Sequence, residues 1–283
     1  MSDIAVVGLG ALAGFTIYLG LPFGRLRGSA PRLRAGLNAL AIGILLFLLW
    51  DVLTHAAEPV EQTLPGTPDG AWGTFAVRAL VVVAGLVVGL MTLVYYDTYL
   101  ARRSQARRAR RYGPGAMATA ERAHPGLLDL GEPTRRLALM IAIGIGLHNF
   151  SEGLAIGQSA ASGELSLAVM LIIGFGLHNA TEGFGIVGPM AGGAQRPSWA
   201  LLGLLGLIGG GPTFLGTVIG QSFVNSLVYL GFLALAAGSI LYVILQLLKV
   251  AFRLDQPRAL YLGVLGGLLL GFATDFVITA AGA

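Results

Sequence analysis

The sequence predicts an all-α, polytopic membrane protein, and two observations carry this prediction. Apolar residues make up 55% of the 283-residue chain and charged residues only 11%, whereas soluble domains contain about 25% charged residues. The apolar residues gather in eight stretches, each close to the ~20 residues that a helix needs to cross a bilayer. We therefore expect a single transmembrane domain over residues 1–283.

The expected helices follow one another along the whole chain. They cover approximately residues 3–22, 35–55, 72–98, 135–158, 164–190, 199–221, 225–250 and 259–280. The first helix has arginines after it and no basic residue before it, which is the opposite of a cleavable signal peptide. Glycine accounts for 43 residues, and small residues favour close helix contacts in lipid. Cysteine is absent, so disulfides and thiolate sites are excluded.

The basic residues predict the orientation of the chain. Seventeen of the 18 Lys and Arg residues lie in or beside the loops that follow the first, third, fifth and seventh expected helices. Cytoplasmic loops are enriched in Lys and Arg, so we expect both termini to be extracytoplasmic, in a plasma (inner) membrane. Residues 100–134 are expected to form an Arg-rich cytoplasmic loop that anchors the protein to the membrane surface and does not bind nucleic acid.

One motif occurs twice, at a period of thirty residues. Residues 141–157 read IAIGIGLHNFSEGLAIG, and residues 171–188 read LIIGFGLHNATEGFGIVG. Each copy places His, Asn and Glu near the centre of an apolar helix, where a charged side chain costs about 2.5–3.5 kcal/mol on insertion scales. Positions i and i+4 share one face of a helix. Each copy thus presents an imidazole beside a carboxylate, and two antiparallel helices bring both pairs together within the membrane.

These side chains form a candidate metal site. The imidazoles and carboxylates are expected to bind the ion directly, and the amides to supply carbonyl oxygens or orient their neighbours. The six candidate residues are His148, Asn149, Glu152, His178, Asn179 and Glu182. Nitrogen and oxygen donors without thiols suit a divalent transition metal and not copper(I). A single buried His–Glu pair is commonly structural, but its duplication in adjacent helices favours a metal site. No organic cofactor is expected.

The two motifs also carry a family resemblance. HNFSEG and HNATEG resemble the HNxPEG-type motifs in the fourth and fifth transmembrane helices of the ZIP (Zrt-, Irt-like) metal transporters, and they are most similar to the GufA-type branch. The resemblance implies an eight-helix transporter, not an enzyme, that moves divalent metal into the cytosol. Zinc is the default ion, and iron, manganese, cobalt and cadmium are alternatives. The resemblance also implies a homodimer in the lipid bilayer and an alternating-access motion.

The chain departs from the family pattern at several positions. Ser151 and Thr181 stand where the family has proline, and their hydroxyls are expected to bond to the preceding turn or to contact waters of the ion. Gly211 and Gln246 stand where relatives carry acidic residues. Because two glutamates neutralise one divalent ion, one metal ion is expected instead of two. The run GLIGGGPTFLG, with Pro212, predicts a break or unwound turn in the sixth helix.

Further polar residues are candidates for a path to the metal site. Asp51 and His55 lie one turn apart at the outer end of the second expected helix. They are predicted to form an outer access site, and a solvated interfacial pair is the alternative. Asp275, in the eighth expected helix, either pairs with Arg78 or lines the path.

Two other functions stay open on the sequence alone. One is a non-transporting membrane protein that senses or holds metal, although a fixed di-iron site normally uses Glu-x-x-His motifs and further carboxylates. The other is a channel-like conduit for metal ions. The sequence does not distinguish a carrier from a channel.

Overall fold

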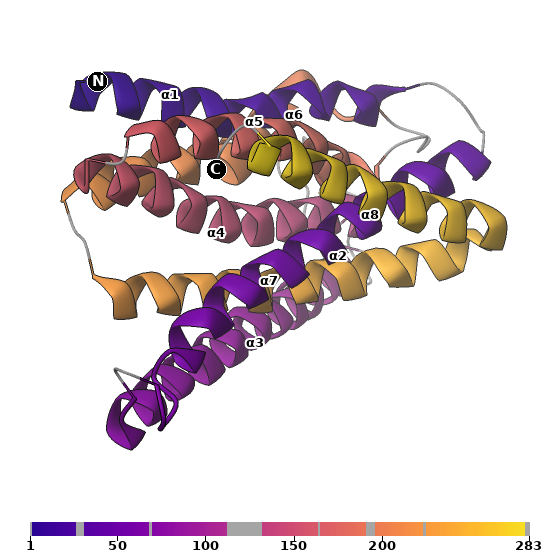
Figure 1. Ribbon diagram of the computed structural model, residues 1–283. Coiled ribbons are helices and arrows are strands. Elements are labelled where there is room, and N and C mark those ends of the chain that lie inside the picture. Colours follow the sequence, from indigo (N-terminus) through magenta and orange to yellow (C-terminus); the bar gives the residue numbers. More distant parts are fainter. Residues whose placement is uncertain are drawn as a thin grey trace.

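The fold is helical, as the composition predicts (Figure 1). The computed structural model describes residues 2–26, 31–67, 70–111, 132–163, 165–190, 196–222 and 225–280, and no β-strand occurs within these ranges. The α-helices are α1 (Asp3–Phe15), α2 (Pro31–Glu61), α3 (Trp72–Arg111), α4 (Pro133–Ala161), α5 (Leu165–Val187), α6 (Trp199–Ser222), α7 (Ser226–Leu254) and α8 (Pro257–Ala280). The 3-10 segments η1 (Thr16–Leu19) and η2 (Leu21–Arg25) extend α1.

Seven segments of the described chain are long and apolar enough to cross a membrane, judged by length and composition. The first of them combines α1 with its two 3-10 segments, and the others lie in α2, α3, α4, α6, α7 and α8. The helix outside this set is α5, which has 23 residues and carries the second motif copy. It packs against α1, α2 and α4, so it lies within the bundle.

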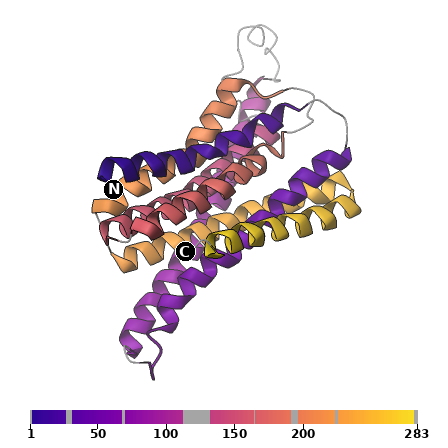
Figure 2. The ribbon, with the colours of Figure 1, turned by 45° about the horizontal axis from the view of Figure 1, so that its top comes forward.

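The helices form two groups, which Figures 1 and 2 show from two directions. In the first group, α6 packs against α1 and α4, and α5 packs against the same two helices. In the second group, α7 packs against α2 and α3, and α8 packs against α2. The groups meet where α4 contacts α7 and where α5 contacts α2. The two motif helices therefore lie in one group and face the other.

Close backbone contacts hold the first motif helix in place. A Cβ atom added to Gly153 on α4 would collide with the carbonyl oxygen of Thr213 on α6. Gly216 on α6 faces the carbonyl of Phe150 on α4 in the same way. Small residues allow helices to approach this closely in lipid. The glycine-rich composition thus fixes α4, and with it the first motif copy, against α6.

The predicted break in the sixth helix is wrong. The helix α6 runs through Pro212 without interruption. Proline removes one backbone hydrogen bond, but neighbouring helices commonly compensate for this loss in membrane proteins. The adjacent glycines are used for packing, since Gly210 faces the carbonyl of Gly14 on α1 and Gly209 faces the side chain of Ile17.

Several helices are longer than the sequence predicts. The helix α3 continues to Arg111, so residues 100–111 of the expected Arg-rich loop are helical. Alanine, arginine and glutamine have high helix propensity, which explains this extension. Residues 112–131 of that loop lie outside the described residues. The helix α2 is likewise extended at both ends, from Pro31 to Glu61.

Candidate metal centre

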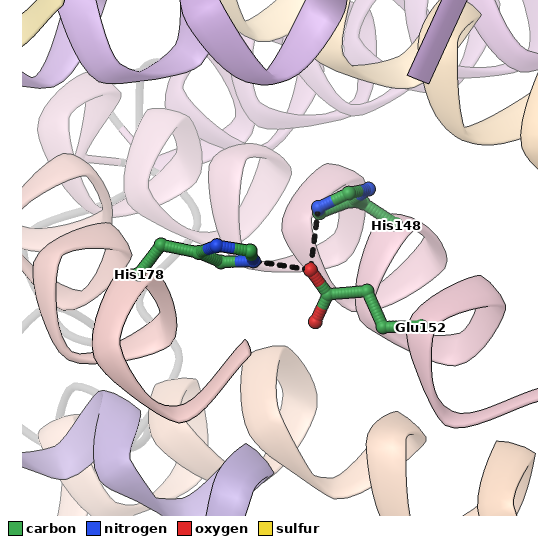
Figure 3. A group of neighbouring side chains, drawn as sticks. All are labelled: His148, Glu152 and His178. Atoms are coloured by element: carbon green, nitrogen blue, oxygen red, sulfur yellow. Dashed lines mark hydrogen bonds and ion pairs between the residues drawn. The ribbon is translucent and has the colours of Figure 1, made fainter. Parts of the chain in front are cut away.

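The hairpin of α4 and α5 brings three of the predicted ligands together (Figure 3). Nε2 of His148 lies 3.0 Å from Oε1 of Glu152, one turn further along α4. Nε2 of His178, on α5, contacts the same oxygen. One ligand atom from each residue lies within 4.8 Å of the other two. A carboxylate oxygen thus lies between imidazoles from two helices, which is a donor set suited to a divalent metal.

Glu182 lies at the edge of this cluster. Its Oε1 is 3.9 Å from Nε2 of His148, and its side chain is fully buried. Within the described residues, neither of its carboxylate oxygens has a hydrogen-bond partner of good geometry. Burying a carboxylate without compensation costs several kcal/mol. A cation bound beside Glu182 would therefore offset an energetic cost that the protein alone leaves in place.

The two asparagines connect the motif helices to other helices. Nδ2 of Asn149 donates to the carbonyl of Gly209 on α6 at 3.0 Å, and Nδ2 of Asn179 donates to the carbonyl of Ala13 on α1 at 3.3 Å. Both asparagines are fully buried. Their Oδ1 atoms have no hydrogen-bond partner in the part of the chain that the structure covers. The amide nitrogens thus orient the side chains, and the carbonyl oxygens stay free as acceptors.

A cavity of about 430 Å³ connects the cluster to the predicted outer site. At its buried end it is lined by His148, Glu152 and His178, and at its exposed end by Asp51 and His55. Because one water molecule occupies about 30 Å³ in the liquid, the cavity has room for a hydrated ion. The structure therefore places three of the six predicted metal-site residues, and both residues of the predicted outer site, on one cavity.

Asp275 on α8 also lines this cavity. The sequence alone allows Arg78 as an alternative partner of Asp275. Arg78 instead donates to the backbone carbonyl of Pro59, near the end of α2, at 2.5 Å. Nδ1 of His55 lies 3.4 Å from Oδ1 of Asp51, so two carboxylates and an imidazole line the cavity away from the buried cluster. Tyr229 on α7 is a further lining residue, and no pattern in the sequence had indicated it.

Fold and site together define the class of this protein: a polytopic helical membrane protein whose cavity ends at a buried imidazole–carboxylate cluster. The sequence model of the family described as ZIP Zinc transporter matches residues 102–279. This range covers more than half of the chain and contains both motif copies. The chain therefore belongs to the ZIP family, whose members are multi-pass membrane transporters of divalent metals. A comparison with curated proteins finds no match.

Proposed function

We propose that this protein transports divalent transition-metal ions into the cytosol, with zinc as the default ion, and that the ion binds between α4 and α5. The observation that carries the proposal is the oxygen of Glu152 that two imidazoles from different helices share at the buried end of a cavity. The proposed direct ligands are His148, Glu152, His178 and Glu182, and Asn149 and Asn179 orient them or add carbonyl oxygens.

The donor set supports ions of borderline softness. Imidazole and carboxylate donors bind zinc well, and they also accept iron, manganese, cobalt and cadmium. Glu152 and Glu182 together neutralise one divalent ion, and a second ion would lack compensation. Since Gly211 and Gln246 replace acidic residues of relatives, we assign one ion to each protomer. The motifs HNFSEG and HNATEG support a divergent member of the GufA-type branch.

The exposed end of the cavity is the proposed access site for the ion. Asp51, His55 and Asp275 lie on two helices that flank this end. Negative charge on the walls of a cleft raises the local concentration of cations. The outer groups would then collect the ion, and the buried cluster would bind it.

The membrane topology is part of the same proposal. All eight helices span the inner membrane, and both termini are extracytoplasmic. The distribution of Lys and Arg supports this orientation, because 17 of the 18 basic residues fall on one side of the bundle in an eight-span count. Likeness to the family supports a homodimer.

Metal uptake into proteoliposomes tests the proposal. Zinc, iron, manganese, cobalt and cadmium are offered to the parent protein, Glu152→Ala, Glu182→Ala and the control Glu61→Ala, which alters an exposed residue at the end of α2. We expect saturable uptake by the parent and the control, and its loss in the two site variants. If the parent takes up no metal, transport is excluded, and metal that resists chelation would then identify a fixed-metal protein. Uptake that survives in Glu152→Ala would exclude the proposed site.

A further inference from the structure

Two hydroxyl groups occupy equivalent places in the two motif copies. Oγ of Ser151 donates to the carbonyl of His148 at 2.6 Å, and Oγ1 of Thr181 donates to the carbonyl of His178 at 2.6 Å. The predicted bonding of these hydroxyls to the preceding turn is thus observed in both helices. In each case the hydroxyl acts on the backbone of the histidine that belongs to the metal cluster.

The surroundings of the two hydroxyls differ. Ser151 is 1% exposed and lines the cavity together with His148, Glu152 and His178. Thr181 is half-buried and is not among the described residues that line the cavity. The two motif copies therefore contain equivalent hydrogen bonds, and in the described part of the chain Ser151 lines this cavity whereas Thr181 does not.

The hydrogen bond to the carbonyl of His148 determines whether the Ser151 hydroxyl faces the cavity as a donor or as an acceptor. A hydroxyl has one proton to donate and two lone pairs to accept with. Since the proton of Ser151 is used by the backbone carbonyl at 2.6 Å, the oxygen is left as an acceptor. The carboxylates of Glu152 and Glu182 are charged acceptors, and Ser151 adds a neutral acceptor to the cavity wall next to Glu152.

The cluster leaves a coordination position for water. Three of the four proposed ligands supply ligand atoms that lie close together, whereas Glu182 lies at the edge of the cluster, 3.9 Å from Nε2 of His148. When the ion is held by the first three residues alone, a fourth position is left for water, as in zinc sites with three protein ligands. A water bound to a divalent ion is a strong hydrogen-bond donor, and the cavity has room for it at about 430 Å³.

We infer that Ser151 accepts a hydrogen bond from a water bound to the transported ion and thereby strengthens binding of the ion. Ser151 is then a positioning residue that acts through the water. The inference rests on the proposed function, because it requires an ion at the cluster of His148, Glu152 and His178.

Metal binding by the full-length protein in detergent tests this role. The variants are Ser151→Ala, the hydroxyl-retaining Ser151→Thr, and the matched control Thr181→Ala. Removing an outer partner of a metal site typically weakens binding by about 10–100-fold. We expect zinc affinity to fall by at least about tenfold in Ser151→Ala and to stay near the parent value in the other two variants.

The visible absorption spectrum of bound cobalt(II) provides a second measurement. This spectrum reports the ligands and waters around the ion, which a change in helix stability alone does not alter. We expect the bands to shift in Ser151→Ala, and to match the parent in Ser151→Thr and Thr181→Ala. Thermal denaturation of each variant checks that the fold is intact.

Three outcomes would overturn the inference. If Ser151→Ala and Thr181→Ala weaken zinc binding equally, the backbone hydrogen bond matters and the cavity contact does not. If Ser151→Ala binds zinc and cobalt as the parent does while Glu152→Ala does not, the inference fails and the proposed site stands. If the parent binds neither ion, the proposed site fails as well.

Discussion

Arg136 on α4 and Asp97 on α3 form an ion pair in which Nε lies 2.9 Å from Oδ1. The two side chains are 19% and 27% exposed, so the pair is largely shielded by the protein. It joins the group of helices that carries the motifs to the group that does not. Asp97 is thus engaged in a contact between helices and does not line the cavity around the cluster.

Reversing one charge of this pair should destabilise the protein. In Asp97→Arg or Arg136→Asp, two like charges would face each other, and we expect a loss of about 1 kcal/mol or more in the free energy of unfolding. The double variant restores opposite charges and should recover most of the loss. Thermal denaturation in detergent measures this. A double variant as unstable as the worse single variant would show that the pair does not couple α3 to α4.

Neutral replacements of the two buried glutamates should differ in their effect on zinc binding. In Glu152→Gln, the side chain keeps its shape but loses the charge that both imidazoles contact. We expect its zinc dissociation constant to rise by more than about 100-fold, beyond the range typical of outer partners. Glu182→Gln should have a smaller effect, because Glu182 lies 3.9 Å from one imidazole only. Competition with a fluorescent zinc chelator measures both constants. If both variants lose zinc affinity equally, the ion lies closer to Glu182 than the contacts of Glu152 with the two imidazoles indicate.

Asp275→Asn should slow metal uptake mainly at low metal concentration. The variant removes negative charge from the exposed end of the cavity and leaves the buried cluster intact. We therefore expect an increased KM with a maximal rate near that of the parent, and a smaller effect at high salt, which screens exposed charges. Initial rates in proteoliposomes over a range of zinc concentrations test this.

A suitable control for that experiment is Asp255→Asn. Asp255 is an exposed residue after α7 with a φ of 47°, a conformation that asparagine also tolerates. The Asp255→Asn substitution removes the same negative charge as Asp275→Asn, but at a site away from the cavity. If both variants raise KM equally, the effect reflects the net charge of the protein and not the cavity.

Gly153→Ala should loosen the contact between α4 and α6. The added methyl group would collide with the carbonyl of Thr213, and overpacking of this kind typically costs about 1–3 kcal/mol. The control is Gly203→Ala on α6, where an added Cβ meets no atom within 4 Å. There we expect unchanged or slightly higher stability, because alanine favours the helix over glycine by about 0.5–1 kcal/mol. Thermal denaturation of both variants distinguishes close packing from a general effect of lost glycine.

The repeated motif made the core of the site predictable, because its spacing constrains two helices at once. The i, i+4 spacing places His148 beside Glu152 on one face, and the short connection to α5 brings His178 to the same oxygen. The directions of Asn149 and Asn179 were not predictable. They depend on which carbonyls α6 and α1 present, and this is decided by packing between distant segments.

Local propensity failed where tertiary packing decides the structure. Pro212 beside three glycines predicts a break, yet α6 is continuous because α1 and α4 pack closely along that region. In the same way, Asp275 in an apolar helix requires a polar environment, but the sequence did not decide between Arg78 and the cavity. That choice follows from the packing of α8 against α2.

The hydrogen bonds of Asn149 to α6 and of Asn179 to α1 give metal binding a mechanical consequence. An ion held by His148 and His178 would act as a removable crosslink between two helices that are each fastened to a different neighbour. A ligand that binds only the folded state adds about 2.7 kcal/mol of stability at a hundred times its dissociation constant. Without metal, the helix bundle would then be less stable and more open to proteolysis than with metal bound. The supply of metal would thus determine the lifetime of the protein as well as its rate of transport.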